Sequence, residues 1–237
     1  MTDSCATPSA DDLPLSAAEA RDRMVAEVTP VTGREFLPVR SALGRILAAD
    51  IVAPHDVPAH DNSAMDGYAV RFDTLPAAGE ARLAVVGTAF AGNAFSGIVG
   101  QGQAVRIMTG AVLPAGADTV VVQEAVRVEG GAVVVPPGQR KGQNTRLAGE
   151  DLARGAVALP AGKRIGPAEL GLIASLGVAE VEVRRRLRVA FFSTGDELAS
   201  IGKPLAPGQV YDSNRYTLHG LLTRLGAEII DMGVVPD

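Results

Sequence analysis

The stretch LRVAFFSTGDEL, residues 187–198, joins an apolar segment directly to a polar turn. The apolar part predicts a buried strand over 187–192, and a second strand is expected over 228–235. Between them, Asn214 is placed to cap a helix that ends at Gly226 and carries leucines at helical spacing: Leu218, Leu221, Leu222 and Leu225. A strand, a helix and a strand in this order form the opening unit of a parallel α/β sheet.

Ligands of such sheets gather beyond the carboxyl ends of the strands, which is where the turn STGDEL, 193–198, falls. Asp237 takes the same position after the second strand. Adjacent parallel strands would bring Asp196, Glu197 and Asp237 together. Clustered carboxylates commonly hold a hard divalent cation, and Mg²⁺ is usual where a phosphate also binds. The alternative for Asp196 and Glu197 is a pair of ordinary helix-start charges stabilised by the helix dipole.

The rest of the chain predicts a multi-domain organisation. A polar segment, 1–12, is expected to be a disordered tail. Residues 13–50 together with 138–184 predict a discontinuous connector domain, with a capping box at Ser16–Glu19 and a short helix near 40–48. Short β-type runs between Gly and Pro residues predict a β-rich domain over 51–137, with strands at 82–86, 104–107, 119–122 and 132–135. Residues 185–237 begin the α/β domain.

The expected fold class is therefore mixed α and β: an elongated α+β connector domain, a small all-β domain and the first β-α-β unit of a parallel-sheet domain. Composition excludes several functional classes. A formal net charge of −5 lacks the basic field of a general nucleic-acid binder. The single Cys excludes an internal disulfide framework. No apolar run approaches about 18 residues and no secretory segment is evident, so we expect a cytoplasmic protein without a membrane partner.

Three further polar loops lie at 62–68 (NSAMDGY), 108–118 (MTGAVLPAGAD) and 142–151 (GQNTRLAGED). The first has the residues of a tight turn, which Met65 and Tyr68 are large enough to anchor in a core. It predicts either a pinned functional loop that fixes Asp66 or a simple strand-entry turn.

In the second loop, Thr109 lies in a TGA sequence that suits an anion but is also an ordinary strand exit. In the third loop, Arg146 predicts either a clamp on phosphate or carboxylate, or a surface salt bridge with Glu150 or Asp151. The histidines lack metal-ligand spacing, and no nucleophilic grouping, Walker motif or GxGxxG is present. The residues alone thus predict metal-assisted anion or phosphate chemistry.

Taken in order, the motifs resemble the MoeA/gephyrin E-domain family, the molybdopterin molybdenumtransferases. The segments that carry the resemblance are DNSAMDGYAV (61–70), RIMTGAVLPAGADTVV (106–121), GQNTRLAGEDL (142–152), IASLGVAEVEV (173–183), RVAFFSTGDEL (188–198), GQVYDSNR (208–215) and DMGVVPD (231–237). The resemblance implies insertion of molybdenum from molybdate into adenylylated molybdopterin, with release of AMP and help from Mg²⁺.

The resemblance also implies roles for individual residues. Asp66, Thr109, Glu197 and Asp237 match catalytic positions. Arg146, Ser193, Thr194 and Gly195 match substrate-binding positions, and Asp196, Glu197 and Asp237 match metal ligands. The family forms homodimers with an active site shared between subunits, and its members also engage other proteins of molybdenum cofactor biosynthesis.

The chain departs from the family because a TGG-type glycine-rich motif, a Lys-rich segment, a GNP motif and a C-terminal β-domain are missing. Two further hypotheses follow. One is a non-catalytic, truncated dimerisation or scaffold module of the same family. The other is a glycine-rich nucleotide-binding module of another pathway, which the lack of a nucleotide fingerprint disfavours.

Overall fold

The computed structural model describes residues 15–235, so the predicted tail at 1–12 and Asp237 lie outside the described residues. The chain divides into two compact units. Unit 1 is Met1–Phe36 with Glu182–Asp237, and unit 2 is Leu37–Val181. Each unit is described below by itself. The fold is mixed α and β, as the sequence predicts.

Unit 2 is built on a six-stranded sheet in the order β7-β4-β6-β5-β9-β8. All of its neighbouring strands pair antiparallel except β5 and β6, which are parallel. The strands are β4 (Gly67–Val70), β5 (Ala81–Ala89), β6 (Gln103–Ile107), β7 (Thr119–Val122), β8 (Arg127–Glu129) and β9 (Ala132–Val135). The strands predicted near 82–86, 104–107, 119–122 and 132–135 are confirmed.

Two clusters of buried side chains hold this sheet together. One contains Tyr68, Val70, Ala81, Leu83, Ala104, Val121, Val133 and Val135. The other contains Ala69, Ala89, Val99, Val105, Ile107, Ala111 and Val120. Small and β-branched residues dominate both clusters. Successive residues of a strand point to opposite faces of the sheet, so neighbours such as Ala69 and Val70 belong to different clusters. The chain thus builds its core with few aromatic residues.

Smaller elements complete unit 2. β2 (Ile51–Val52) pairs with β11 (Val157–Leu159), and β3 (Asn62–Ser63) pairs with β10 (Thr145–Arg146). The helices are η2 (Val39–Ser41), η3 (Phe72–Thr74), η4 (Gln123–Ala125) and α2 (Pro167–Ser175). The boundary between the units falls within the two-stranded pair of β1 (Arg34–Pro38) and β12 (Glu180–Arg184).

The helix predicted near 40–48 is wrong. Only the 3-10 turn η2 forms there. Arg45 N–H still donates to the nearby carbonyl of Ala42 (3.0 Å), but the N–H groups on either side bond to a distant segment. Gly44 N–H donates to the carbonyl of Ile165 (2.8 Å), and Leu47 N–H donates to that of Lys163 (2.9 Å). Gly44 has a φ of 77°, a left-handed conformation that ends any helix. The apolar spacing in this segment reflects burial of Leu47 and Ala48 against the unit, not helical periodicity.

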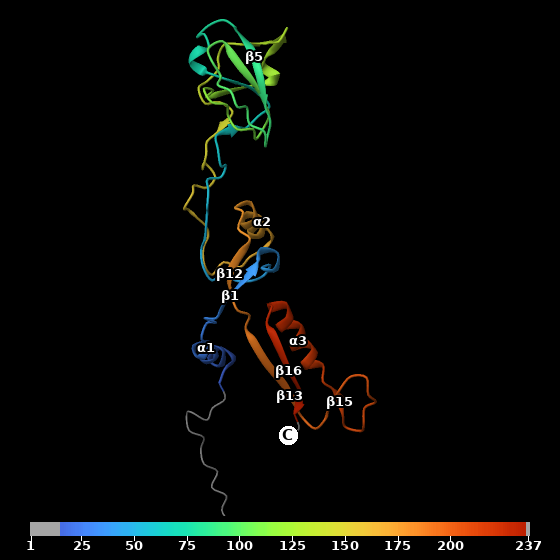
Figure 1. Ribbon diagram of the computed structural model, residues 1–237. Helices are drawn as coiled ribbons and strands as arrows, with labels where there is room; N and C mark the ends of the chain where they lie inside the picture. The colour runs from blue at the N-terminus through green and yellow to red at the C-terminus, as the bar shows by residue number, and fades with distance from the viewer. Residues whose placement is uncertain (1–14, 236–237) are drawn as a thin grey trace, which may run out of the picture. The chain divides into compact units, whose positions relative to one another are not determined.

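Unit 1 contains the predicted strand, helix and strand. β13 (Arg188–Thr194) pairs in parallel with β16 (Glu228–Val235), and α3 (Ser213–Leu225) connects them and packs against both (Figure 1). β14 (Leu198–Ala199) and β15 (Val210–Tyr211) form a second short parallel pair. The helix α1 (Ala17–Glu27) begins with the predicted capping box of Ser16 and Glu19. Of the residues described, none belongs to a helix both long and apolar enough to span a membrane.

Candidate functional site

The three polar loops of unit 2 meet around the short strand β3. Ser63 N–H donates to the carbonyl of Ala111 (3.0 Å), and Gly110 N–H donates to the carbonyl of Ser63 (2.8 Å). On its other side β3 pairs with β10, which places Arg146 opposite Asn62. Segments that are far apart in sequence therefore form one locally hydrogen-bonded surface. We call the convergence of 61–66, 108–113 and 142–148 the loop junction.

Asp66 and Thr109 are in direct contact at the loop junction. Both the backbone N–H and the hydroxyl of Thr109 donate to Oδ1 of Asp66, each at 2.8 Å. The backbone N–H, followed by the hydroxyl, lowers the pKa of Asp66, and the positive charge of Arg106 adds to the effect. Asp66 is therefore ionised at neutral pH. None of the hydrogen bonds found among the described residues involves its second oxygen, Oδ2.

The backbone on both sides of Asp66 is also fixed. Its carbonyl accepts a hydrogen bond from Gln123 N–H (3.1 Å). Ser63 Oγ donates to the carbonyl of Met65 (2.5 Å), a local turn of the kind that Ser favours. Tyr68 is buried as predicted, but Met65 is 46% exposed, so the predicted anchoring by Met65 is wrong. Hydrogen bonds hold this side of the loop instead of an apolar contact.

Arg146 forms the ion pairs that the sequence offered as the alternative to an anion clamp. Its guanidinium Nε donates to Glu150 Oε1, and Nη2 donates to Asp151 Oδ1 (2.6 Å). These two carboxylates, with Glu150 the larger contributor, raise the pKa of Arg146. The other three N–H groups of this guanidinium form no hydrogen bond among the described residues, but an anion that binds there meets the negative charge of both carboxylates. The clamp role of Arg146 stays a prediction.

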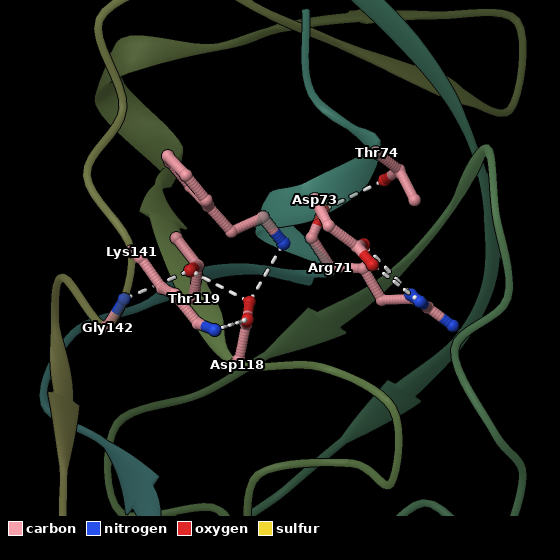
Figure 2. Close-up of polar contacts among 8 residues, drawn as sticks. Arg71, Asp73, Thr74, Asp118, Thr119, Lys141 and Gly142 are labelled. Carbon is pink, nitrogen blue, oxygen red and sulfur yellow. Dashed lines mark hydrogen bonds and ion pairs between the residues drawn. The ribbon is translucent and has the colours of Figure 1, made fainter.

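The segment that leads to Arg146 is anchored on β7 (Figure 2). Gly142 N–H donates to Thr119 Oγ1 (3.2 Å), and Lys141 Nζ lies 3.7 Å from Asp118 Oδ2. Asn144 adopts a φ of 56° and donates from Nδ2 to the carbonyl of Val120 (2.9 Å). Asn tolerates this left-handed conformation better than most residues, which explains its place in the QNTR sequence.

In unit 1, the turn STGDEL follows β13 as predicted. The parallel register sets Ser193 opposite Val234 and Thr194 opposite Val235. The two strand ends therefore lie side by side, and Asp237 follows two residues beyond, outside the described residues. Gly195 is buried with a φ of 137°, and an added Cβ there would lie 2.5 Å from Glu197 Oε2. The Glu197 carboxylate thus folds back over Gly195, and the positive φ is the feature that favours glycine at this position.

Asp196 and Glu197 are exposed, and no helix begins at them: a turn leads directly into β14. The alternative of helix-start charges is therefore wrong. Within residues 15–235, no group of three or more His, Cys, Asp or Glu side chains is arranged to hold a metal ion. The described residues thus supply two carboxylates of the predicted Mg²⁺ site. The third, Asp237, lies outside the described residues, and Mg²⁺ binding stays a prediction.

Sequence reasoning missed two polar groups. Asp212, not the predicted Asn214, caps α3 by accepting from Arg215 N–H (3.1 Å), and it is only 4% exposed. Its Oδ2 and the Oδ1 of Asn62 at the loop junction are buried without a hydrogen-bond partner. The signal for Asp212 was present in the sequence, because an Asp preceding Ser and Asn competes with Asn214 for the cap.

Residues 15–177 of the chain match the model of the MoeA N-terminal region (domain I and II). The chain belongs to the MoeA family. Residues 190–237 match a probable molybdopterin binding domain. The MoeA match covers the loop junction and the whole six-stranded sheet. The second match covers β13, α3 and β16.

Relatives within the MoeA family agree. The chain is 46% identical to the molybdopterin molybdenumtransferase of Haemophilus influenzae over 94% of this chain and 55% of the relative. It is 43% identical to that of Nostoc over 86% of this chain and 47% of the relative. A crystal structure of the MoeA protein from Pyrococcus horikoshii superposes with a TM-score of 0.86 at 34% identity, over 93% of this chain and 59% of that one. The chain spans about half the length of the curated relatives it matches.

Proposed function

We propose that the protein is a cytoplasmic molybdopterin molybdenumtransferase. The reaction inserts molybdenum from molybdate into adenylylated molybdopterin and releases AMP, as a step of molybdenum cofactor biosynthesis. Membership of the MoeA family and the names of the relatives support the proposal. The observation that carries it is the contact of Asp66 with Thr109, because these residues come from two motifs 43 residues apart and are joined by two hydrogen bonds.

Asp66 and Thr109 would act together on the substrate. Thr109 occupies Oδ1 of Asp66 with two hydrogen bonds and fixes the direction of the carboxylate. Oδ2 is then presented for a hydrogen-bond donor of the substrate. A reacting group held in a fixed direction avoids the entropy of being oriented during the reaction. We assign Asp66 and Thr109 to catalysis, and Arg146 to substrate binding through a rearrangement of its two ion pairs.

The STGDEL turn would bind the adenylyl side of the substrate. Ser193, Thr194 and the tight Gly195 suit close approach to a phosphate, and Asp196, Glu197 and Asp237 would hold Mg²⁺. When bound, Mg²⁺ offsets the negative charge of the phosphoanhydride. We further propose a homodimer in which each active site draws on both subunits, with other proteins of cofactor biosynthesis as additional partners.

The test is release of AMP from adenylylated molybdopterin in the presence of molybdate, followed by chromatography. We expect release that depends on molybdate and Mg²⁺. Asp66→Asn should lower the rate by about 100-fold, the effect typical of removing a positioned acid–base or electrostatic group. Thr109→Ser, which keeps the hydroxyl donor, should retain most of the rate. Equal rates for Asp66→Asn and the unaltered protein would contradict the catalytic assignment.

The second candidate is a dimerisation or scaffold module without catalysis. The two ion pairs of Arg146 favour it, because the two carboxylates already balance the positive charge that would attract an anion. Light scattering after size exclusion separates the candidates when it is combined with titration of pterin and molybdate. A dimer that binds neither ligand and releases no AMP supports the scaffold.

A further inference from the structure

Arg106 lies on β6, two residues before the loop junction, and two neighbours hold its side chain. Its guanidinium carbon lies 5.0 Å from the centroid of the Tyr68 ring, directly across from it in the β4–β6 register. Its Nη2 donates to Oε1 of Gln123. Tyr68 is 7% exposed, so the surrounding core holds its ring in place beneath the guanidinium. Stacking on an aromatic ring and one side-chain amide therefore set the position of this guanidinium.

The other arginines on strands of this sheet differ from Arg106. Arg82 on β5 pairs with Glu129 at 2.7 Å, and Arg127 on β8 pairs with Glu80 at 2.7 Å. Arg106 forms no ion pair with any carboxylate among the described residues. A guanidinium has five N–H groups, and only the bond to Gln123 uses one of them. Arg106 is thus a half-buried, oriented cation whose remaining donors have no protein acceptor in the part of the chain described.

The chain places this cation next to the proposed catalytic pair. Arg106 precedes Thr109 by three residues on the same strand and its exit turn. Its partner Gln123 donates its backbone N–H to the carbonyl of Asp66 (3.1 Å). The positive charge is near enough to favour the ionised form of Asp66. The free donors of Arg106 and the free Oδ2 of Asp66 therefore belong to one surface.

We propose that Arg106 is a further substrate-binding residue, whose guanidinium binds a tetrahedral oxyanion beside Asp66 and Thr109. The inference rests on the proposed function, in which molybdate and the adenylyl phosphate are the two oxyanions of this chemistry. The planar guanidinium has several free N–H groups that can donate to two adjacent oxygens of such an anion at once. A Lys ammonium does not offer this geometry. The positive charge also offsets the repulsion between the anion and Asp66.

The test is calorimetric titration of the intact protein with molybdate in one arm and with AMP in the other. Arg106→Gln should weaken binding of one of the two anions by about 10-fold or more, the loss expected for a charged hydrogen bond. Arg106→Lys, which keeps the charge over Tyr68, should weaken it less. The matched control is Arg82→Gln. Thr88 on β5 lies opposite Arg106, and Arg82 is six residues further back along β5, or about 20 Å away.

The arm that loses affinity identifies the anion. Unchanged affinity in Arg106→Gln for both anions, an equal loss in Arg82→Gln, or no binding of either anion by the unaltered protein would each overturn the inference. If Arg106→Gln does not fold, which circular dichroism reports, a several-fold loss in Arg106→Lys supports the inference and an unchanged affinity overturns it. Loss of anion binding in a protein that releases no AMP would support the role of Arg106 and contradict the proposed function.

Discussion

The loop junction of unit 2 and the STGDEL turn of unit 1 carry the same kinds of residue but are built differently. At the loop junction, Asp66 receives two hydrogen bonds from Thr109, and its own carbonyl is bonded to Gln123. In the turn, Asp196 and Glu197 are exposed and follow one another along the chain. The Glu197 carbonyl accepts a hydrogen bond from Val210 N–H (2.9 Å), but neither side chain accepts one among the described residues. Hydrogen bonds therefore orient the carboxylate of Asp66 and not those of Asp196 and Glu197.

The difference follows from the cores beneath the two sites. Two clusters of buried side chains support the sheet of unit 2. Among the described residues of unit 1, the buried apolar side chains are Val183 and Phe191, and α3 has none. A site on a large core can hold side chains in preset directions, because the core resists their displacement. The comparison indicates that the large core of unit 2 can hold side chains more rigidly than the small core of unit 1.

Substitution of two glycines gives the largest expected contrast between the units. A Cβ at Gly67 would lie 2.2 Å from the carbonyl oxygen of Val121, so Gly67→Ala forces β4 and β7 apart and should destabilise unit 2 by about 3 kcal/mol. At Gly220 in α3 an added Cβ meets nothing within 4 Å. Gly220→Ala should therefore stabilise unit 1 by about 0.5–1 kcal/mol.

Urea denaturation followed by circular dichroism measures both changes. Gly171→Ala in α2, where an added Cβ also meets nothing within 4 Å, is the control within unit 2. If Gly67→Ala were no more harmful than Gly171→Ala, the claim that β4 and β7 leave no room for a side chain at residue 67 would be wrong.

A smaller effect is expected at the cap of α3 in unit 1. Asp212→Ala removes the acceptor for Arg215 N–H and should cost about 1 kcal/mol, the usual value for losing a helix cap. Because α3 buries no side chain of its own, faster amide exchange should be confined to this helix and β16. Asp212→Asn, which keeps a capping oxygen, is the matched control. Exchange that also rises in β4 and β7 would break the proposed separation between the units.

The smallest expected effect is on the stability of the protein at acidic pH, through the carboxyl group of Asp66. Thr109 lowers the pKa of Asp66 below its ordinary value of 3.8. A carboxyl group with a lowered pKa stabilises the folded state above its unfolded pKa, and this contribution is lost as the pH falls through the folded value. The difference in melting temperature between the unaltered protein and Asp66→Asn should be constant near neutral pH and shrink below about pH 3.8.

Thermal melts across this range measure the difference. Thr109→Val, which keeps the N–H donor and loses the hydroxyl, should give an intermediate curve. Glu197→Gln is the comparison in unit 1, and its melting temperature near neutral pH should match that of the unaltered protein, since its side chain accepts no hydrogen bond among the described residues. An identical response of Asp66→Asn and Glu197→Gln would remove the contrast between the two sites.

Local signals in the sequence predicted much of the fold. Apolar runs identified β5, β6, β7 and β9 of unit 2 and β13 and β16 of unit 1, and the capping box identified α1. Two strands of the six-stranded sheet, β4 and β8, were not predicted. The helix near 40–48 failed because its N–H groups bond to Lys163 and Ile165, more than 100 residues away. Periodicity alone does not distinguish a helix from a buried irregular segment when the partner strand is remote.

The candidate site was predicted in part. The turn residues around Asp66 indicated a pinned loop, but not that Thr109 would hold the carboxylate. Two readings of Arg146 were equally open until the structure placed Glu150 and Asp151 on its guanidinium. No local signal distinguished Arg106 from the other strand arginines, because a missing counter-ion is a property of its three-dimensional surroundings.

The sequence by itself determined most of the longer strands and the motifs that are present, since these follow from side-chain size, glycine and proline positions, and spacing along the chain. Only the tertiary structure decided which polar groups meet. Ionisation, orientation and free hydrogen-bonding capacity depend on atoms within a few ångströms, and at the loop junction those atoms come from three remote segments. For that reason Thr109 orients the carboxylate of Asp66, and Arg146 forms two ion pairs. Arg106 forms no ion pair with a carboxylate among the described residues.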